Sequence, residues 1–279
     1  MTNWEFTSSA PIDIVVDNWH TGSVAIAAGS AETVTVQVTP TRHGRDSDEM
    51  VGQTTVDFDG GRLHVSGPRA AGMFMRGRHG LDLTIRAPAE SSCAVSTSSA
   101  DVSLVGPLHA VEIKTASGDV TAGSASGPVR VTTASGDVWL EHAATDVLIT
   151  TASGDQHVMH AGGMTKLQTA SGDVKVGNAG GSVSANTASG DICVVEVRDG
   201  MVDTTSMSGD VSVGVARGVG VYLDLASMTG SVENQLDETD ESADVSLSVK
   251  CRTVSGDITI NRTSAAASDE PRAAQADSI

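Results

Sequence analysis

The chain repeats the five-residue sequence Thr-Ala-Ser-Gly-Asp at a constant interval of 18 residues. A constant interval of this length is typical of solenoids, in which each repeat packs on its neighbours and none is stable alone. The repeat therefore constrains the architecture more than the biological role. Five copies match in full: Thr115–Asp119, Thr133–Asp137, Thr151–Asp155, Thr169–Asp173 and Thr187–Asp191.

Each repeat contains two stretches in which aliphatic residues stand two positions apart. Val138 and Leu140 follow Asp137, and Val147 and Ile149 come nine residues later. A period of two predicts a β-strand with one buried face, and extending it backwards places the Ala and Gly of the repeat on that face too. We therefore expect an all-β parallel solenoid with 18-residue coils. Each coil would hold two nine-residue half-repeats, and their strands would form two facing sheets.

Imperfect copies flank the regular ones, and the later intervals grow to 19, 21 and 26 residues, which predicts insertions in the later coils. The longest insertion, Glu233–Asp244, is acidic and lacks the glycine and the spacing of an EF-hand. We expect it to be a solvated loop. The imperfect copies are Thr97–Asp101, Ser206–Asp210, Ser227–Ser231 and Thr253–Asp257.

The two ends of the chain differ from the repeats. Residues 1–90 contain short alternating stretches separated by turn residues, including Asp59-Gly60-Gly61, which is typical of a hairpin turn. We expect this segment to form an N-terminal β cap, because an open coil would expose unpaired strand edges. Residues 91–262 would form the solenoid repeats. Residues 263–279 have no apolar pattern and are expected to be a disordered tail.

Composition limits the partners and the compartment. The net charge of -18 disfavours nucleic acid and anionic membranes as partners. No stretch approaches the ~20 apolar residues of a transmembrane helix, and no signal peptide is evident, so a cytoplasmic location is expected, with export to the cell surface left open. Cys93, Cys193 and Cys251 are too sparse for a disulfide framework. By strand parity we expect Cys93 and Cys251 to point inward and Cys193 outward.

The aspartates of the repeat are the first candidate site, because equivalent residues of successive coils should form a column on the surface. Stacked carboxylates repel each other by ~1 kcal/mol per neighbour in water. Hydrogen bonds from hydroxyl and turn N–H groups are the favoured compensation, and Ca²⁺ is the alternative, although Gly and Asp are adjacent here, unlike in calcium-binding β-rolls. The candidate metal ligands are Asp119, Asp137, Asp155, Asp173 and Asp191.

A second candidate site is the basic and apolar segment 69–80, RAAGMFMRGRHG, in an otherwise acidic chain. It could be a hairpin loop that folds back on the cap, or a contact for an acidic partner or a membrane surface. The candidate partner contacts are Met73, Phe74, Met75, Arg76 and Arg78. A weaker candidate is the stacked pair His142 and His160, with Glu196 two coils further on, for which a solvent-exposed stack is favoured over a metal site.

The sequence contains no catalytic motif, such as GxSxG, HExxH or a P-loop. The repeated serine has no histidine recurring beside it and occurs in five equivalent places. We therefore expect no enzyme activity and no cofactor.

Several motifs besides the repeat indicate a family: Trp4 with Phe6, Val16 to Val24 (V-x-N…G-S-V), and Phe58–Val65 (F-x-G-G-x-L-x-V). With these motifs and the repeat, the chain resembles the bacterial putative-adhesin family of β-strand-repeat proteins, whose function is unknown. This resemblance implies a right-handed β-solenoid without established enzyme activity. It favours a structural or interaction module that binds a protein partner or self-assembles through flat polar faces. The alternatives are a Ca²⁺-stabilised surface adhesin and, more remotely, a polysaccharide-active β-helix enzyme.

Overall fold

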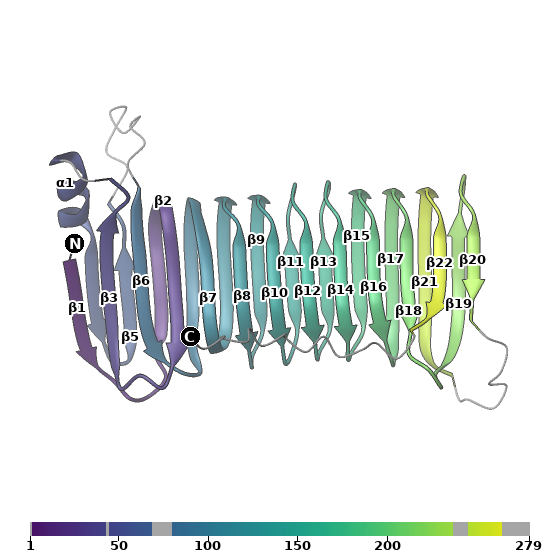
Figure 1. The fold of residues 1–279 in the computed structure, drawn as a ribbon, viewed down its shortest axis with the longest axis horizontal. Coiled ribbons are helices and arrows are strands. Elements are labelled where there is room, and N and C mark those ends of the chain that lie inside the picture. Colours follow the sequence, from purple (N-terminus) through teal and green to yellow (C-terminus); the bar gives the residue numbers. More distant parts are fainter. Residues whose placement is uncertain (1, 43–44, 69–79, 237–244, 264–279) are drawn as a thin grey trace, which may run out of the picture.

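The computed structural model describes residues 2–42, 45–68, 80–236 and 245–263. The chain forms an elongated stack of β-strands that run across the long axis (Figure 1). The parallel strands wind into a nearly closed, solenoid-like arrangement, so the predicted all-β class is confirmed. Within these described residues, no helix has the length and hydrophobicity needed to cross a bilayer.

Two rows of parallel strands form the regular part of the stack. In each row, residues that are 18 positions apart pair with one another, as Val138 does with Val120 and Gln156. The first row contains β8 (Val120–Ala125), β10 (Val138–Ala143), β12 (Gln156–Ala161), β14 (Val174–Ala179) and β16 (Ile192–Val197). The second row contains β9 (Val129–Ser135), β11 (Val147–Thr150), β13 (Thr165–Gln168) and β15 (Val183–Ser189).

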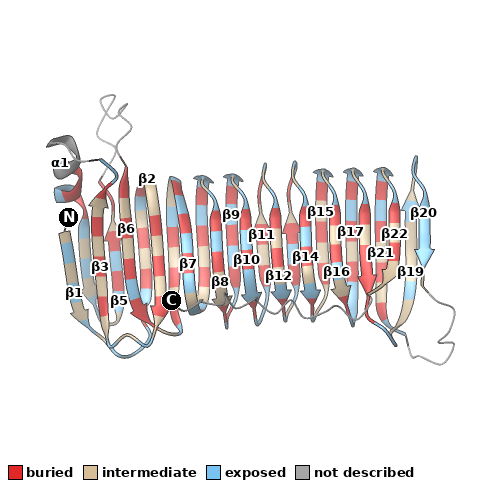
Figure 2. Ribbon diagram, in the orientation of Figure 1, coloured by how far each residue is buried: buried red, intermediate tan, exposed pale blue. Residues whose placement is uncertain are grey.

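The two rows enclose one aliphatic core that extends along the rod. The residues predicted to be buried are buried: Val138, Val147, Ile149, Val174 and Val176. Along the strands of these two rows, buried positions largely alternate with more exposed ones, which Figure 2 shows as bands on the ribbon. The thiol parity is confirmed as well, because Cys93 and Cys251 are buried and Cys193 is partly exposed.

The repeated pentapeptide differs from the prediction, because its alanine faces solvent and its threonine faces the core. Ala134 is exposed, whereas Thr133 is only 4% exposed. The reason is that the strand parity runs from Val129 through Val131 to Thr133, and the chain then turns a corner before the next strand begins at Val138. The pentapeptide is therefore a corner and does not continue the strand that follows it.

Threonine and glycine of neighbouring coils interact at this corner. The buried Thr187 hydroxyl donates to the carbonyl oxygen of Gly172 at 3.4 Å, and Thr253 donates to that of Gly209 at 3.1 Å. A Cβ atom on Gly154 would lie 2.2 Å from the carbonyl oxygen of Gly136, and Gly154 has φ 140°. The corners can stack this closely only because glycine occupies this position.

The N-terminal end combines parallel and antiparallel strands. It contains one described helix, α1 (Arg45–Gln53), which the sequence did not predict. The predicted hairpin at Asp59-Gly60-Gly61 is confirmed by the antiparallel pairing of β4 with β5. Phe6 and Phe58, from two edge strands, pack with ring centroids 5.1 Å apart. The strands are β1 (Thr2–Thr7), β2 (Asp13–Gly29), β3 (Thr33–Pro40), β4 (Thr55–Asp59), β5 (Arg62–Ser66), β6 (Leu81–Pro88) and β7 (Ser91–Ser117).

At the other end, the order of coils in space differs from their order in sequence. One row runs β17 (Gly200–Ser208), β21 (Val245–Ser255), β19 (Gly220–Ser227). The other runs β18 (Val211–Val215), β22 (Ile258–Arg262), β20 (Val232–Gln235). The last coil in sequence thus lies between the two that precede it. Residues 233–235 of the predicted loop form part of β20, so that part of the prediction was wrong, and residues 237–244 lie outside the described residues.

Candidate functional site

The aspartates of the repeat form a hydrogen-bonded ladder along the rod. The backbone N–H of Asp155 donates to Oδ1 of Asp137 at 2.8 Å, and the N–H of Asp173 donates to Oδ1 of Asp155 at 2.8 Å. The ladder follows the order of the coils in space, since Asp257 donates to Asp210 and Ser231 donates to Asp257, each at 2.8 Å. The predicted adjacency of Asp137 and Asp155 is confirmed. The other bonds join Asp101 to Asp119, Asp119 to Asp137, Asp173 to Asp191 and Asp191 to Asp210.

The backbone N–H groups provide the compensation that the stacked carboxylates need. At the end of the ladder, hydrogen bonds from the backbone and side chain of Ser231 hold the pKa of Asp257 below its usual value. In the part of the chain that the structure describes, no group of three or more His, Cys, Asp or Glu side chains converges as a metal site. The carboxylates of the ladder thus accept hydrogen bonds from backbone N–H groups, and the Ca²⁺ alternative gains no support from the described residues.

The predicted histidine column runs along the first row of strands, near the C-terminal end of each strand. His142 and His160 are register partners with ring centroids 6.2 Å apart. Asn178 lies 3.2 Å from His160 on the next strand, and Glu196 follows as its partner in β16. His142, His160 and Asn178 are exposed and Glu196 is partly exposed, so these side chains form a stack open to solvent.

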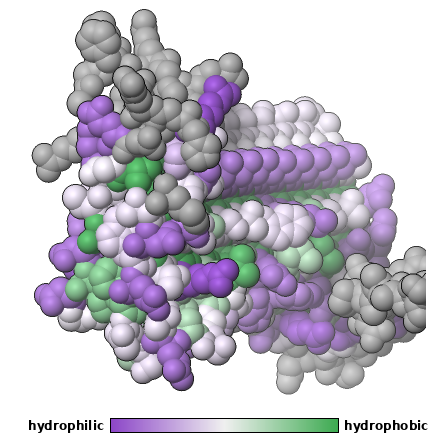
Figure 3. Space-filling model, turned by 60° about the vertical axis from the view of Figure 1, so that its left-hand side comes forward, coloured by the Kyte–Doolittle hydropathy of each residue, from purple (hydrophilic) through white to green (hydrophobic). Residues whose placement is uncertain are grey.

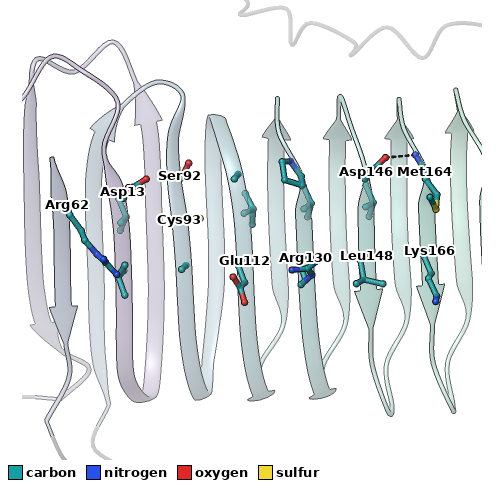
Figure 4. Close-up of a pocket in the computed structure, with 18 residues that line it drawn as sticks. Asp13, Arg62, Ser92, Cys93, Glu112, Arg130, Asp146, Leu148, Met164 and Lys166 are labelled. Carbon is teal, nitrogen blue, oxygen red and sulfur yellow. Dashed lines mark hydrogen bonds between the residues drawn. The ribbon is translucent and has the colours of Figure 1, made fainter.

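A shallow groove lies on the outer face of the second row, and it is a candidate binding site. Its volume is about 590 Å³, and it crosses β2, β7, β9, β11 and β13 (Figure 4). Three cationic residues and three anionic residues line it, so its formal charge is zero, in contrast to -18 for the whole chain. These six residues are Arg62, Arg130, Lys166, Asp13, Glu112 and Asp146.

One side of the groove is a row of register partners on successive strands. Glu112, Arg130, Leu148 and Lys166 occupy this row in order. Glu112 forms a salt bridge with Lys114 at 2.6 Å, and the hydrogen bond and charge of Lys114, together with the charge of Arg130, hold the pKa of Glu112 below its usual value. Within the described ranges, Arg130 and Lys166 form no salt bridge. Two available cations therefore flank one aliphatic side chain.

The other side of the groove is shaped by Asp146 and Met164. Oδ1 of Asp146 accepts a hydrogen bond from the backbone N–H of Met164 at 2.9 Å, which fixes its carboxylate at the rim (Figure 4). The Met164 side chain is 57% exposed. The Met164 side chain therefore offers an apolar contact on the side of the groove opposite the row that contains Arg130 and Lys166.

The opposite face of the rod carries a different row, in which Trp139, His157, Lys175 and Cys193 are successive register partners. The ring centroids of Trp139 and His157 lie 3.9 Å apart. Burial, and then the charge of Lys175, lowers the pKa of His157, and its Nε2 atom is buried without a hydrogen-bond partner. Burial raises the pKa of the Cys193 thiol, which Lys175 partly offsets.

The sequence did not single out the groove residues. The signal was present, because Glu112, Arg130, Leu148 and Lys166 occupy the same position in four successive repeats. The sequence-predicted partner contacts Met73, Phe74, Met75, Arg76 and Arg78 lie outside the described residues. In the view of Figure 3, residues of similar hydropathy form parallel rows along the surface of the rod, and the hydrophilic rows appear as regular stripes.

These features define a solenoid-like all-β protein with polar outer faces. The chain belongs to the Toastrack DUF4097 family, whose model matches residues 12–261. The family resemblance seen in the sequence is thus confirmed. No curated protein matches the chain.

Solved bacterial structures resemble the chain at low identity. A putative adhesin from Bacteroides fragilis is 12% identical with a TM-score of 0.41, and the match covers 94% of this chain and 96% of that one. A putative adhesin from Parabacteroides distasonis is 13% identical with a TM-score of 0.41 and the same coverage. A protein of the same species described as a putative lipid binding protein is 14% identical with a TM-score of 0.43, again with that coverage.

Proposed function

We propose that this protein is a non-catalytic interaction module that binds an extended segment of a protein partner in the groove across β7, β9, β11 and β13. The observation that carries the proposal is the row in which Arg130 and Lys166 flank Leu148 without a salt bridge. Charged side chains that form no salt bridge with the described residues are available to a ligand, and the groove is locally neutral in an otherwise acidic chain.

The spacing of the row suggests what the segment looks like. Arg130 and Lys166 are two strands apart, which corresponds to roughly 9–10 Å at the usual separation between strands. A peptide in the extended polyproline II conformation has three residues per turn and advances about 3.1 Å per residue, so two carboxylates three positions apart lie on one face and would match the two cations. The peptide between them would pass over Leu148. The partner segment is therefore an acidic, extended one with the pattern Glu-x-x-Glu.

The absence of catalysis is part of the same proposal. Catalysis needs titratable groups that converge in a water-poor pocket. The charged groups of this groove stand in rows open to water, which suits binding better than bond breaking. The pairing of residues 18 positions apart supports 18-residue coils, and the antiparallel strands at the N-terminal end support a cap formed by residues 1–90. Crossover connections between parallel strands of one sheet are nearly always right-handed, which supports a right-handed course.

Fluorescence anisotropy with a labelled peptide tests the proposal. The probe is a soluble peptide in which two glutamates three positions apart flank a leucine, and the control probe carries glutamines in their place. We expect Arg130→Glu and Lys166→Glu each to weaken binding at least tenfold, with stronger binding at low salt. Lys175→Glu, on the opposite face, is the matched control. If the acidic and neutral probes bind equally, or if Lys175→Glu has the same effect, the proposed site is wrong.

A further inference from the structure

The rod ends at β19 and β20 in two strand edges that have no partner among the described residues. β19 pairs with β21 alone, and β20 pairs with β22 alone. Each edge therefore presents a row of backbone N–H and C=O groups on the side that faces away from the rod. Figure 1 shows both strands at the end opposite the N-terminus. Such edges are templates for pairing with another chain.

The same end exposes the cross-section of the hydrophobic core. Leu223 and Leu225 are partly exposed, although their register partners Val249 and Cys251 are completely buried. The side chains point inward in both strands, and only the outer one lacks a further coil to cover it. On the other row, Val232 is 45% exposed, whereas its partner Ile258 is buried. An apolar stripe therefore lies between the two free edges.

This end has little of the usual protection against edge pairing. β19 contains no proline and no lysine, and its single charged residue, Asp224, is bound in a salt bridge to Arg252 at 3.4 Å. β20 contributes one more charge, Glu233. Natural edges that remain unpaired are commonly blocked by lysine, proline or bulges. The one register shift of β19 lies between its first two residues, Gly220 and Val221, so the strand from Val221 onward is a regular edge suited to pairing.

The two segments that adjoin this end supply few apolar side chains. Residues 237–244, which connect β20 to β21, read DETDESAD and contain no large apolar side chain. After β22, Thr263 donates through its N–H and its hydroxyl to the carbonyl oxygen of Val215 in the inner strand β18, each at 3.0 Å. Residues 264–279 contain one large aliphatic residue, Ile279. These observations favour a cover supplied by another molecule.

We propose that the β19–β20 end binds the same end of a second copy and forms a head-to-head dimer. The second copy presents two edges at the same separation with the same apolar stripe between them, so both ladders and the core can continue across the contact at once. A two-fold axis perpendicular to the rod makes the pairing antiparallel and the contact isologous, which closes the assembly at two chains. This surface is distinct from the groove proposed for a partner.

Sedimentation velocity over a wide range of concentrations tests this proposal. We expect a reversible dimer with twice the 28.3 kDa mass of the chain, favoured by added salt, because salt screens the repulsion between two acidic copies. Leu223→Lys places a charge in the stripe and should abolish the dimer. Met164→Lys replaces an exposed apolar residue in the middle of the rod and is the matched control. Arg130→Glu should leave the dimer unchanged, which separates this test from that of the groove.

Hydrogen exchange provides a second measurement that does not depend on a variant folding. The amides of β19 and β20 should be protected in concentrated wild-type protein and lose protection on dilution, while those of β10 and β12 stay protected. A monomer at all concentrations would overturn the proposal. So would a dimer that survives in folded Leu223→Lys, an open-ended polymer, or exchange in β19 that does not depend on concentration.

Discussion

The backbone N–H of Asp155 donates to the carboxylate of Asp137 at 2.8 Å, although both side chains carry the same charge and lie on adjacent coils. The hydrogen bond thus links two residues whose side chains repel each other. The carboxylate of each aspartate accepts a hydrogen bond from a backbone N–H of the next coil. The repetition of this one bond along the rod explains why the pentapeptide ends in aspartate. Substitution of one aspartate can therefore separate the free-energy cost of two stacked charges from the stabilisation that the hydrogen-bond acceptor provides.

We predict that Asp155→Asn and Asp155→Ala have different effects. Asparagine keeps an oxygen that can accept the N–H of Asp173 and removes the repulsion, so the free energy of unfolding should change by less than about 0.5 kcal/mol or increase. Alanine removes the acceptor and should cost about 1 kcal/mol. Urea denaturation measures both, with Ser153→Ala as the control at an exposed neighbouring position. Equal destabilisation by asparagine and alanine would mean that the negative charge itself is required.

We predict that Gly154→Ala is strongly destabilising. Its Cβ atom would lie 2.2 Å from the Gly136 carbonyl oxygen, and the residue would also be held at φ 140°. Overpacking and backbone strain together should cost more than about 2 kcal/mol. Gly218→Ala is the matched control, because Gly218 has φ 75° but no atom within 4 Å of an added Cβ. Its cost should be limited to about 1 kcal/mol of backbone strain. Similar thermal shifts for the two variants would contradict the steric explanation.

The sequence predicted the parts of the fold that the regular 18-residue interval encodes, and missed those that depart from this interval or vary in residue type from coil to coil. The alternation around Val138 and Val147 predicted the strands and the core, and the interval of 18 predicted the aspartate column. The insertion of β21 between β17 and β19 was not predictable, because the intervals encode the lengths of insertions but not the order of strands. The groove was missed because the residues at its repeat position, Arg130, Leu148 and Lys166, differ in type from coil to coil, so no repeated motif marked them.

We predict that Gln156→Val stabilises the protein. Gln156 is 1% exposed and occupies a position where neighbouring coils have Val138 and Val174. Its amide nitrogen donates to Thr151 and to the carbonyl oxygen of Gln168, but its buried Oε1 atom has no partner. A buried acceptor without a partner costs about 1–3 kcal/mol. Valine of similar volume should therefore raise the free energy of unfolding by about 1 kcal/mol.

The reverse substitution one coil away is the control for this prediction. Val174→Gln should destabilise the protein by at least about 1 kcal/mol, because it buries an amide among aliphatic side chains. Denaturant titration of both variants measures the change. A loss of stability in Gln156→Val would show that its two hydrogen bonds are worth more than the uncompensated oxygen costs.

We predict that acid weakens the fold through His157. Its pKa in the folded protein is lowered from 6.5 by burial, and then by the charge of Lys175. The unfolded chain therefore binds the proton more readily than the folded chain. Because stability rises with pH wherever the unfolded state binds more protons, the contribution of His157 is fully present above pH 6.5 and falls as the pH decreases toward its folded pKa.

His157→Gln should remove this part of the pH dependence, so the loss of melting temperature between neutral and mildly acidic solution should be smaller than in the wild type. His142→Gln is the matched control, because His142 lies in a neighbouring exposed column. Thermal melts at a series of pH values measure the difference, and NMR titration of the ring protons measures the pKa directly. A His157 pKa above that of a histidine in the unfolded chain would reverse the sign and contradict the burial of the ring against Trp139.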